Sequence, residues 1–243
     1  MRITIATIFP EMFEGFITTS IIKKAVLKGL VEIDTVDIRS FSKDKHRRVD
    51  DYPFGGGQGL VMMAQPVIDA LNSVKTPESK VIYLTPVGEV FSQPKAKEFV
   101  LQKHIILLCG HYEGIDERIM EHVDMCLSIG DFVLTGGEVA AMVVTDAIVR
   151  LVDGVIAEAS HQQESFEGDL LEYPQYTRPA QYEGKTVPDV LLSGNHEAIR
   201  TWRLKQSIRK TMQYRPDLLR KRIFNKEEKK LLLEIESEKV EKD

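Results

Sequence analysis

Apolar residues in the first 150 positions follow two alternating patterns. Short apolar runs that are typical of strands cover 2–9, 31–36, 81–85 and 105–109. Apolar residues at helical spacing cover 11–28, a stretch shortly after Pro66, 94–103, 116–121 and 138–149. The first helix is expected to stop at Gly29, and the third strand at Pro86 and Gly88. This alternation predicts an α/β fold with a mostly parallel sheet.

The pattern changes after residue 156. Residues 157–176 show little periodicity, and loops this long in compact domains are usually functional or disordered. Farther on, Asn195 can cap a helix whose apolar positions include Trp202 and Ile208. We therefore expect an α/β domain over 1–157, a linker over 158–176 and a small helical domain over 177–243.

The composition is that of a globular protein, with 43% hydrophobic and 28% charged residues, which excludes disordered and collagen-like chains. No run approaches the roughly 18 apolar residues of a membrane-spanning helix, and the first ten residues lack the pattern of a signal peptide. Cys109 and Cys126 are too few for a disulfide framework. We expect a cytoplasmic protein with no membrane contact.

Charge is spread unevenly along the chain. The net charge is −5, yet residues 195–226 alone carry +8, while residues 1–194 carry −10 and residues 227–243 carry −3. A basic block of this kind is typical of proteins that bind nucleic acid, because Lys and Arg neutralise phosphates. A solvated helix face, with its acidic partners elsewhere in the chain, is the alternative interpretation.

The glycines do not form a known nucleotide-binding motif. No segment matches the full G-x-x-x-x-G-K-[ST] pattern of a P-loop, and Met62 occupies the third glycine position of a dinucleotide fingerprint. Three glycine-bearing turns, 85–88, 109–114 and 128–137, each follow an expected strand. Glycines there allow backbone groups to approach a ligand, although three ordinary turns would look the same.

Taken together, these segments resemble the bacterial tRNA (guanine-N1)-methyltransferases of the knotted SPOUT superfamily. One such motif is weak evidence, whereas this many in the same order over 200 residues are specific. The matching segments are 8–13 (IFPEMF), 49–59 (VDDYPFGGGQG), 110–118 (GHYEGIDER), 128–131 (SIGD), 135–138 (TGGE), 176–179 (YTRP), 192–196 (LSGNH) and 202–207 (WRLKQS).

The resemblance implies properties that periodicity cannot show. It implies a deep trefoil knot in the parallel sheet, within a methyl-donor-binding domain over 1–157, and a tRNA-binding role for 177–243. It implies S-adenosylmethionine as the methyl donor and a homodimer whose active sites use both subunits. It also implies methylation of the guanosine immediately 3′ of the anticodon.

Two catalytic residues follow from the resemblance. N1 of guanine carries a proton that a base must remove, and a cation should stabilise the charge that develops on the neighbouring carbonyl oxygen. Arg150 stands at the position of the family's arginine. Glu164 stands where the family has an Asp general base, so its carboxylate must be placed differently; Asp169 ranks second. Arg150 could instead complement the dipole of the preceding helix, and Glu164 could be a solvated linker residue.

The resemblance also gives binding residues. Those expected around the methyl donor are Tyr83, Leu84, Thr85, Pro86, Gly110, Tyr112, Glu113, Ser128, Ile129, Gly130, Asp131, Phe132, Val133, Leu134, Gly136 and Gly137. Many members have Tyr at the position of Phe132, so a hydroxyl contact there would be lost. Those expected to bind tRNA are His46, Asp50, Arg200, Arg203, Lys205 and Arg209. The sequence has no carboxylate cage, so Mg²⁺, which the family is reported to use, would sit with the RNA or Glu164.

Two alternatives stay open at this stage. A related knotted methyltransferase acting on ribose oxygens or rRNA would not need the linker carboxylate. A non-catalytic RNA-binding protein would bind tRNA without turnover, and the Glu at the base position is the one feature in its favour.

Overall fold

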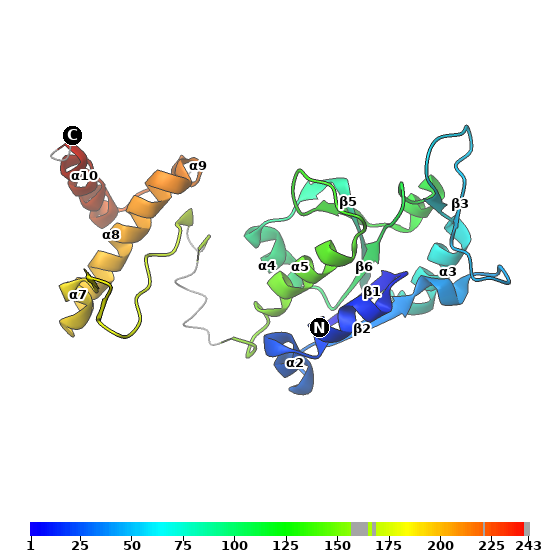
Figure 1. Cartoon of the computed structure of the whole chain (residues 1–243), viewed down its shortest axis with the longest axis horizontal. Helices are drawn as coiled ribbons and strands as arrows, with labels where there is room; N and C mark the ends of the chain where they lie inside the picture. Colours follow the sequence, from blue (N-terminus) through cyan, green and yellow to red (C-terminus); the bar gives the residue numbers. More distant parts are fainter. Residues whose placement is uncertain (157–164, 167–168, 221, 241–243) are drawn as a thin grey trace. The chain divides into compact units, whose positions relative to one another are not determined.

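The computed structural model describes residues 1–156, 165–166, 169–220 and 222–240. Its contacts divide the chain into two compact units, Met1–Ala157 and Glu158–Asp243. In Figure 1 the first unit runs from blue to green and the second from yellow to red. Glu164, the expected base, lies outside the described residues.

Five strands form the central sheet of the first unit. They are β1 (Arg2–Thr7), β2 (Glu32–Asp37), β5 (Ser79–Val90), β6 (His104–Cys109) and β7 (Met125–Ser128). Their order is β2-β1-β6-β5-β7, and every neighbouring pair is parallel. The α/β fold with a mostly parallel sheet is therefore confirmed.

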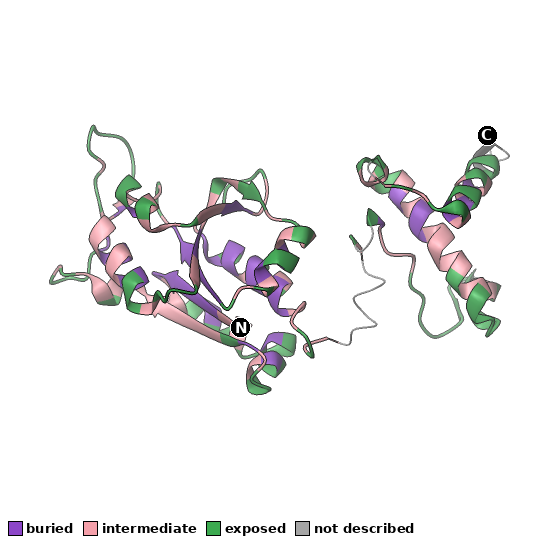
Figure 2. Ribbon diagram, turned by 180° about the vertical axis from the view of Figure 1, so that it is seen from behind, coloured by how far each residue is buried: buried purple, intermediate pink, exposed green. Residues whose placement is uncertain are grey.

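Helices cover both faces of the sheet, so β6 is buried along its whole length (Figure 2). Because successive side chains of a strand point to opposite faces, Ile105 and Leu107 enter one core and Ile106 and Leu108 the other. The first core is closed by α2 (Ser20–Leu27), α4 (Gln93–Val100) and α5 (Glu138–Val149). The second is closed by α3 (Ala64–Val74) and the 3₁₀ helices η2 (Ile38–Phe41) and η3 (Glu117–His122).

The single helix expected over 11–28 is three shorter elements. They are η1 (Pro10–Phe13), α1 (Glu14–Ile17) and α2. The hydroxyls of Thr18 and Thr19 donate to the carbonyls of Glu14 and Gly15, and Thr19 is extended, so the helix is interrupted there. The expected stop is confirmed, because Gly29 has a φ of +68°.

Strand β5 does not end at Pro86, contrary to the prediction from sequence. Its pairing with β7 is interrupted between Leu84 and Glu89, so the missing N–H of Pro86 removes no ladder hydrogen bond. At Gly88 the backbones of β5 and β7 nearly touch, and a Cβ there would lie 2.3 Å from Leu127 N. The glycine is needed for close approach of two strands rather than for a turn.

The second unit is helical, with one short hairpin. Its elements are β8 (Gln181–Tyr182), β9 (Lys185–Thr186), α7 (Asp189–Leu192), α8 (His196–Tyr214), α9 (Pro216–Leu219) and α10 (Lys226–Val240). Asn195 caps α8 as predicted, because its Oδ1 accepts from the Ala198 amide. Ile208, Leu231 and Ile235 form a small core between α8 and α10. None of the helices in the described residues is both long enough and apolar enough to cross a membrane.

We expect Gly88→Ala to destabilise the first unit by about 1–3 kcal/mol or more, because the added Cβ forces two paired backbones apart. Gly15→Ala is the matched control: Gly15 lies in α1, and a Cβ there meets no atom within 4 Å. The control should be neutral or stabilising by about 0.5–1 kcal/mol. Urea unfolding of both variants measures this, and equal stabilities would contradict the close approach.

Candidate functional site

Three segments meet at the carboxyl ends of β6 and β7, beside the interrupted part of β5. Residues 110–114 follow β6, residues 129–137 follow β7, and residues 84–86 lie where the pairing of β5 is interrupted. The amide of Gly137 donates to the carbonyl of Gly110 at 2.8 Å, and His111 forms a bridge with Gly136. Together the segments enclose a cavity of about 290 Å³. Ligands of α/β sheets bind at this edge, so the cavity is the candidate site.

The cavity brings together fifteen of the sixteen residues expected to bind a methyl donor; Asp131 does not line it. The lining residues that the sequence analysis did not select are His111, Gly114, Leu127, Thr135 and Ala140. His111, Gly114 and Thr135 lie inside the motifs already identified, so their position was the available signal. Leu127 and Ala140 carried no signal beyond that of ordinary core residues.

Two glycines allow the loops to approach so closely. A Cβ at Gly137 would lie 2.7 Å from Cys109 Cα and 3.1 Å from Gly110 N, so a side chain would push α5 away from the end of β6. Gly130 has a φ of +144°, which residues with a side chain rarely adopt. Backbone geometry therefore requires glycine at both positions.

A buried carboxylate joins three elements beside the cavity. Glu138 is 2% exposed, its Oε1 accepts from Thr7 Oγ1 at 2.8 Å, and its Oε2 lies 3.7 Å from His111 Nδ1. Glu138 is the first residue of α5, where the helix dipole favours negative charge. The side chain thereby ties β1, the loop after β6 and α5 together.

The phenol and thiols near the cavity are kept protonated. Burial raises the pKa of the Tyr83 hydroxyl. Burial, with a smaller contribution from the charge of Glu138, places the pKa of the Cys109 thiol well above its ordinary value. Burial also raises the pKa of Cys126. At neutral pH these groups are uncharged, so they pack and bind rather than act as bases or nucleophiles.

The loop with His46 and Asp50 is joined to the cavity rim. Asp50 lies in β3 (Asp50–Asp51), which pairs with β4 (Val61–Met62), and the Met62 amide donates to the Gly114 carbonyl. Asp44 shapes the loop by accepting from the His46 amide. A hydrogen bond from the Arg48 side chain lowers the pKa of Asp44 to about 2. Neither His46 nor Asp50 lines the cavity itself.

Arg150 lies far from the cavity of its own chain. Helix α5 begins at the cavity, since Gly137 and Ala140 line it, and its 12 residues span about 18 Å. Arg150 directly follows the other end of the helix. The chain then reaches the amino ends of the strands, where Gly154 faces Leu30, two residues before β2. The two expected parts of the active site are thus at opposite ends of α5.

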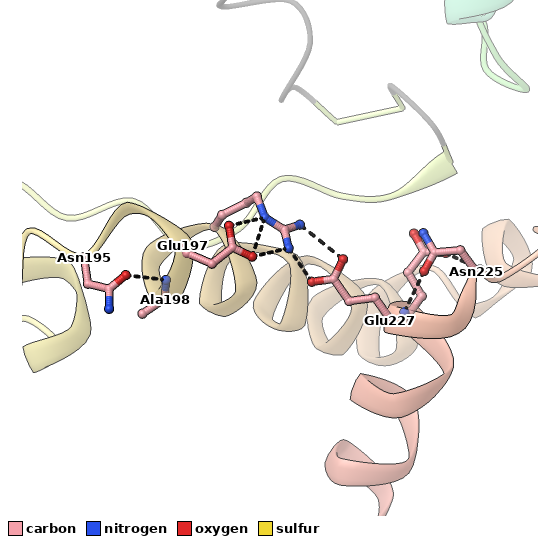
Figure 3. A network of polar contacts seen from close by, with 7 residues as sticks. Asn195, Glu197, Ala198, Asn225 and Glu227 are labelled. Atoms are coloured by element: carbon pink, nitrogen blue, oxygen red, sulfur yellow. Dashed lines mark hydrogen bonds and ion pairs between the residues drawn. The ribbon is translucent and has the colours of Figure 1, made fainter.

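The basic face of α8 is largely balanced by carboxylates. The guanidinium of Arg200 lies between Glu197 and Glu227 and pairs with both, at 2.8 and 2.6 Å (Figure 3). Glu227 belongs to α10, so part of the negative C-terminal segment neutralises the positive block that precedes it.

The same pairing continues along α8. Lys205 pairs with Glu234 and Glu238 of α10, and Arg209 pairs with Glu238. A phosphate would compete with these carboxylates for the cations. Arg203 differs from Arg200, Lys205 and Arg209, because its guanidinium lies over the ring of Tyr173 and pairs with no carboxylate in the described part of the chain.

A family model described as "tRNA (Guanine-1)-methyltransferase TrmD" matches residues 1–221. A protein of Dictyoglomus turgidum is 54% identical over 239 residues, which is 98% of each chain. One of Clostridium botulinum is 55% identical over 96% of this chain and 97% of its own. One of Fusobacterium nucleatum is 52% identical over 99% of this chain and 100% of its own. All three are named tRNA (guanine-N(1)-)-methyltransferase.

We expect Thr7→Val to lower the free energy of unfolding by about 1–3 kcal/mol, because the buried Glu138 carboxylate loses its hydroxyl donor. Thr145→Val is the control. Thr145 is fully buried in α5, and its Oγ1 has no hydrogen-bond partner among the described residues, so removing that hydroxyl should be neutral or stabilising. Thermal or urea unfolding compares the two. A larger loss at Thr145 would refute the role of Thr7.

Proposed function

The chain belongs to the tRNA (guanine-1)-methyltransferase family, and from this premise we propose that it methylates N1 of the guanosine immediately 3′ of the anticodon, with S-adenosylmethionine as the donor. The main observation behind the proposal is the cavity at the carboxyl ends of β6 and β7, beside the interrupted part of β5, where glycines allow the loops to approach closely. It brings residues from three distant segments to one place, and a family match covers all of them.

The chemistry of the cavity lining supports S-adenosylmethionine as its ligand. Close-packed glycine backbones, such as those of Gly110 and Gly136, leave amides and carbonyls to bond an adenine edge. Leu84, Ile129 and Leu134 offer apolar faces for the ring. When bound, the donor supplies a methyl group on a positively charged sulfur. The cavity residues would hold and orient it.

The transfer needs two groups acting on the guanine. Glu164 would take the N1 proton, because a protonated ring nitrogen is a poor nucleophile. Arg150 would stabilise negative charge on the neighbouring carbonyl oxygen. Asp169, the second-ranked carboxylate, is exposed in the second unit. Mg²⁺, if it takes part, would sit with the RNA or Glu164; the described residues contain no cluster of three or more metal-ligating side chains.

A homodimer would reunite the separated parts of the site. Because about 15 Å of helix separates Arg150 from Ala140 at the cavity wall, the Arg150 that serves a cavity would come from a second copy. Helix α5 also keeps Val139 and Val143, one turn apart, 47% and 45% exposed. An apolar stripe on the helix that links cavity and arginine supports a two-fold interface that includes α5.

We also propose a trefoil knot for the first unit, as the family resemblance implies. Residues 111–136 form a loop whose ends are held together by the hydrogen bond from Gly137 to Gly110. The end of β5 is hydrogen-bonded to the same loop, since the Phe91 amide donates to the carbonyl of Ser128.

The first unit would be the catalytic domain, 158–176 the linker and 177–243 the tRNA-binding domain. A tRNA substrate implies the cytoplasm as its location.

Methyl transfer to two tRNA transcripts tests the proposed function. One transcript has guanosine immediately 3′ of the anticodon and the other has adenosine there. Label from S-adenosylmethionine should enter only the first, at N1. Glu164→Gln should slow transfer by about 10²- to 10⁴-fold, and Asp169→Asn should leave it unchanged. Equal labelling of both transcripts, or tRNA binding with no transfer, would reject the proposal in favour of another target or a binding protein.

We expect Arg150→Ala to lose turnover while keeping its affinity for S-adenosylmethionine.

Mixing of two inactive variants in one dimer then tests in which subunit's site Arg150 acts. Leu134→Arg fills the cavity and should also be inactive alone. In a mixed dimer, the intact cavity of the Arg150→Ala subunit meets the intact Arg150 of the other. Co-expression should therefore restore about a quarter of wild-type activity, because half of the dimers are mixed and each has one complete site. No restoration would place Arg150 in the cavity of its own chain. Arg2→Ala, at the amino end of β1 and outside the cavity, is the control for loss of an arginine.

A further inference from the structure

A second cavity lies wholly within the second unit. It measures about 440 Å³ and is bounded by residues 173–180 on one side and by α7 and α8 on the other. Its walls include three aromatic rings, those of Tyr173, Tyr176 and Trp202. The rings of Tyr176 and Trp202 are 6.4 Å apart and tilted by 53°, and Tyr176 is 49% exposed. An aromatic cavity of this kind suits a flat, aromatic ligand.

Arg203 gives the cavity a polar wall. Its guanidinium carbon lies 4.8 Å from the ring centre of Tyr173, in the geometry of a cation-π contact. Its Nε is buried and has no hydrogen-bond partner among the described residues. A buried N–H without an acceptor lowers the stability of the fold, because its lost hydration is not replaced. Such a group therefore indicates that a hydrogen-bond acceptor, such as a ligand, is absent. Arg200, Lys205 and Arg209 on the same helix already pair with carboxylates.

We propose that this cavity binds one unpaired base of the tRNA, stacked on Tyr176 and Trp202, with Arg203 donating to the base edge. The inference rests on the proposed function, which supplies RNA as the partner. Every base has an aromatic face, and stacking on aromatic side chains is the usual way in which proteins hold unpaired bases. Arg178, which also lines the cavity, would lie near the backbone phosphate of the captured nucleotide.

The cavity is separate from the methyl-donor site, because all of its lining residues belong to the second unit. It would hold the tRNA by a nucleotide that is not methylated. Its contribution is therefore to the affinity for tRNA and not to the methyl-transfer step. The other cations of α8 would add general attraction, whereas the aromatic cavity would fix the position of the RNA.

The single tryptophan of the chain makes the cavity directly observable. We expect tRNA to quench the fluorescence of Trp202. Tyr176→Ala should raise the Kd for tRNA about tenfold and reduce the quenching. Tyr176→Phe, which keeps the aromatic face, should bind as the wild type does. Tyr214→Ala is the control, since Tyr214 is also an exposed tyrosine, at the end of α8, and does not line the cavity. Arg203→Lys keeps the charge but loses the planar donor pair, so it should also weaken binding.

Methyl transfer and S-adenosylmethionine affinity are measured on the same variants. In Tyr176→Ala the KM for tRNA should rise while kcat at saturating tRNA stays unchanged. Unaltered tRNA affinity in Tyr176→Ala, or full affinity in Arg203→Lys, would overturn the base-binding role. Quenching that follows protein concentration rather than tRNA would assign the cavity to a second copy of the chain. If the wild type quenches with tRNA but methylates no guanine, the proposed function fails and the cavity remains an RNA site.

Discussion

The close approach of backbones at the carboxyl edge of the sheet is the constraint on which the first unit depends. Gly88 lets the backbone of β5 lie directly against that of β7, and Gly137 lets α5 begin directly against the end of β6. Neither position has room for a Cβ without separating these backbones. The cavity lies beside these close approaches, and the glycines that line it bring main-chain amides, which are fixed in direction, to its wall. A ligand site made this way is already organised before the ligand arrives.

Polar groups then hold these elements in register. Glu138 is nearly inaccessible to water, and it is tolerated because Thr7 donates to it and the start of α5 favours its charge. In the second unit, repulsion among the cations of α8 is compensated by carboxylates of α10 that pair with them. That arrangement lets a strongly basic helix fold, and it leaves Arg203 as a cation turned toward an aromatic cavity.

Sequence reasoning succeeded where periodicity or capping decides the structure. The buried strand at 105–109, the helix at 138–149 and the cap at Asn195 all follow from local rules. It failed at Pro86 and Gly88, two residues of types that normally end a strand. There the pairing of β5 with β7 is interrupted and the two backbones approach closely, so the strand continues through both residues. Such features depend on partners distant in sequence. The cavity residues came from resemblance, and Leu127 and Ala140 were missed because core and site residues look alike.

The position of Arg150 is the reason for which we propose that a second copy takes part in the chemistry. A helix that starts at the carboxyl ends of parallel strands must end near their amino ends, because it packs back along the sheet. A residue at its far end is excluded from the cavity at its start. Local flexibility does not bridge about 15 Å of regular helix. If Arg150 acts on the guanine, the reacting base is held between two chains. The dimer is then part of the active site, and dissociation would abolish transfer even though each cavity stays intact.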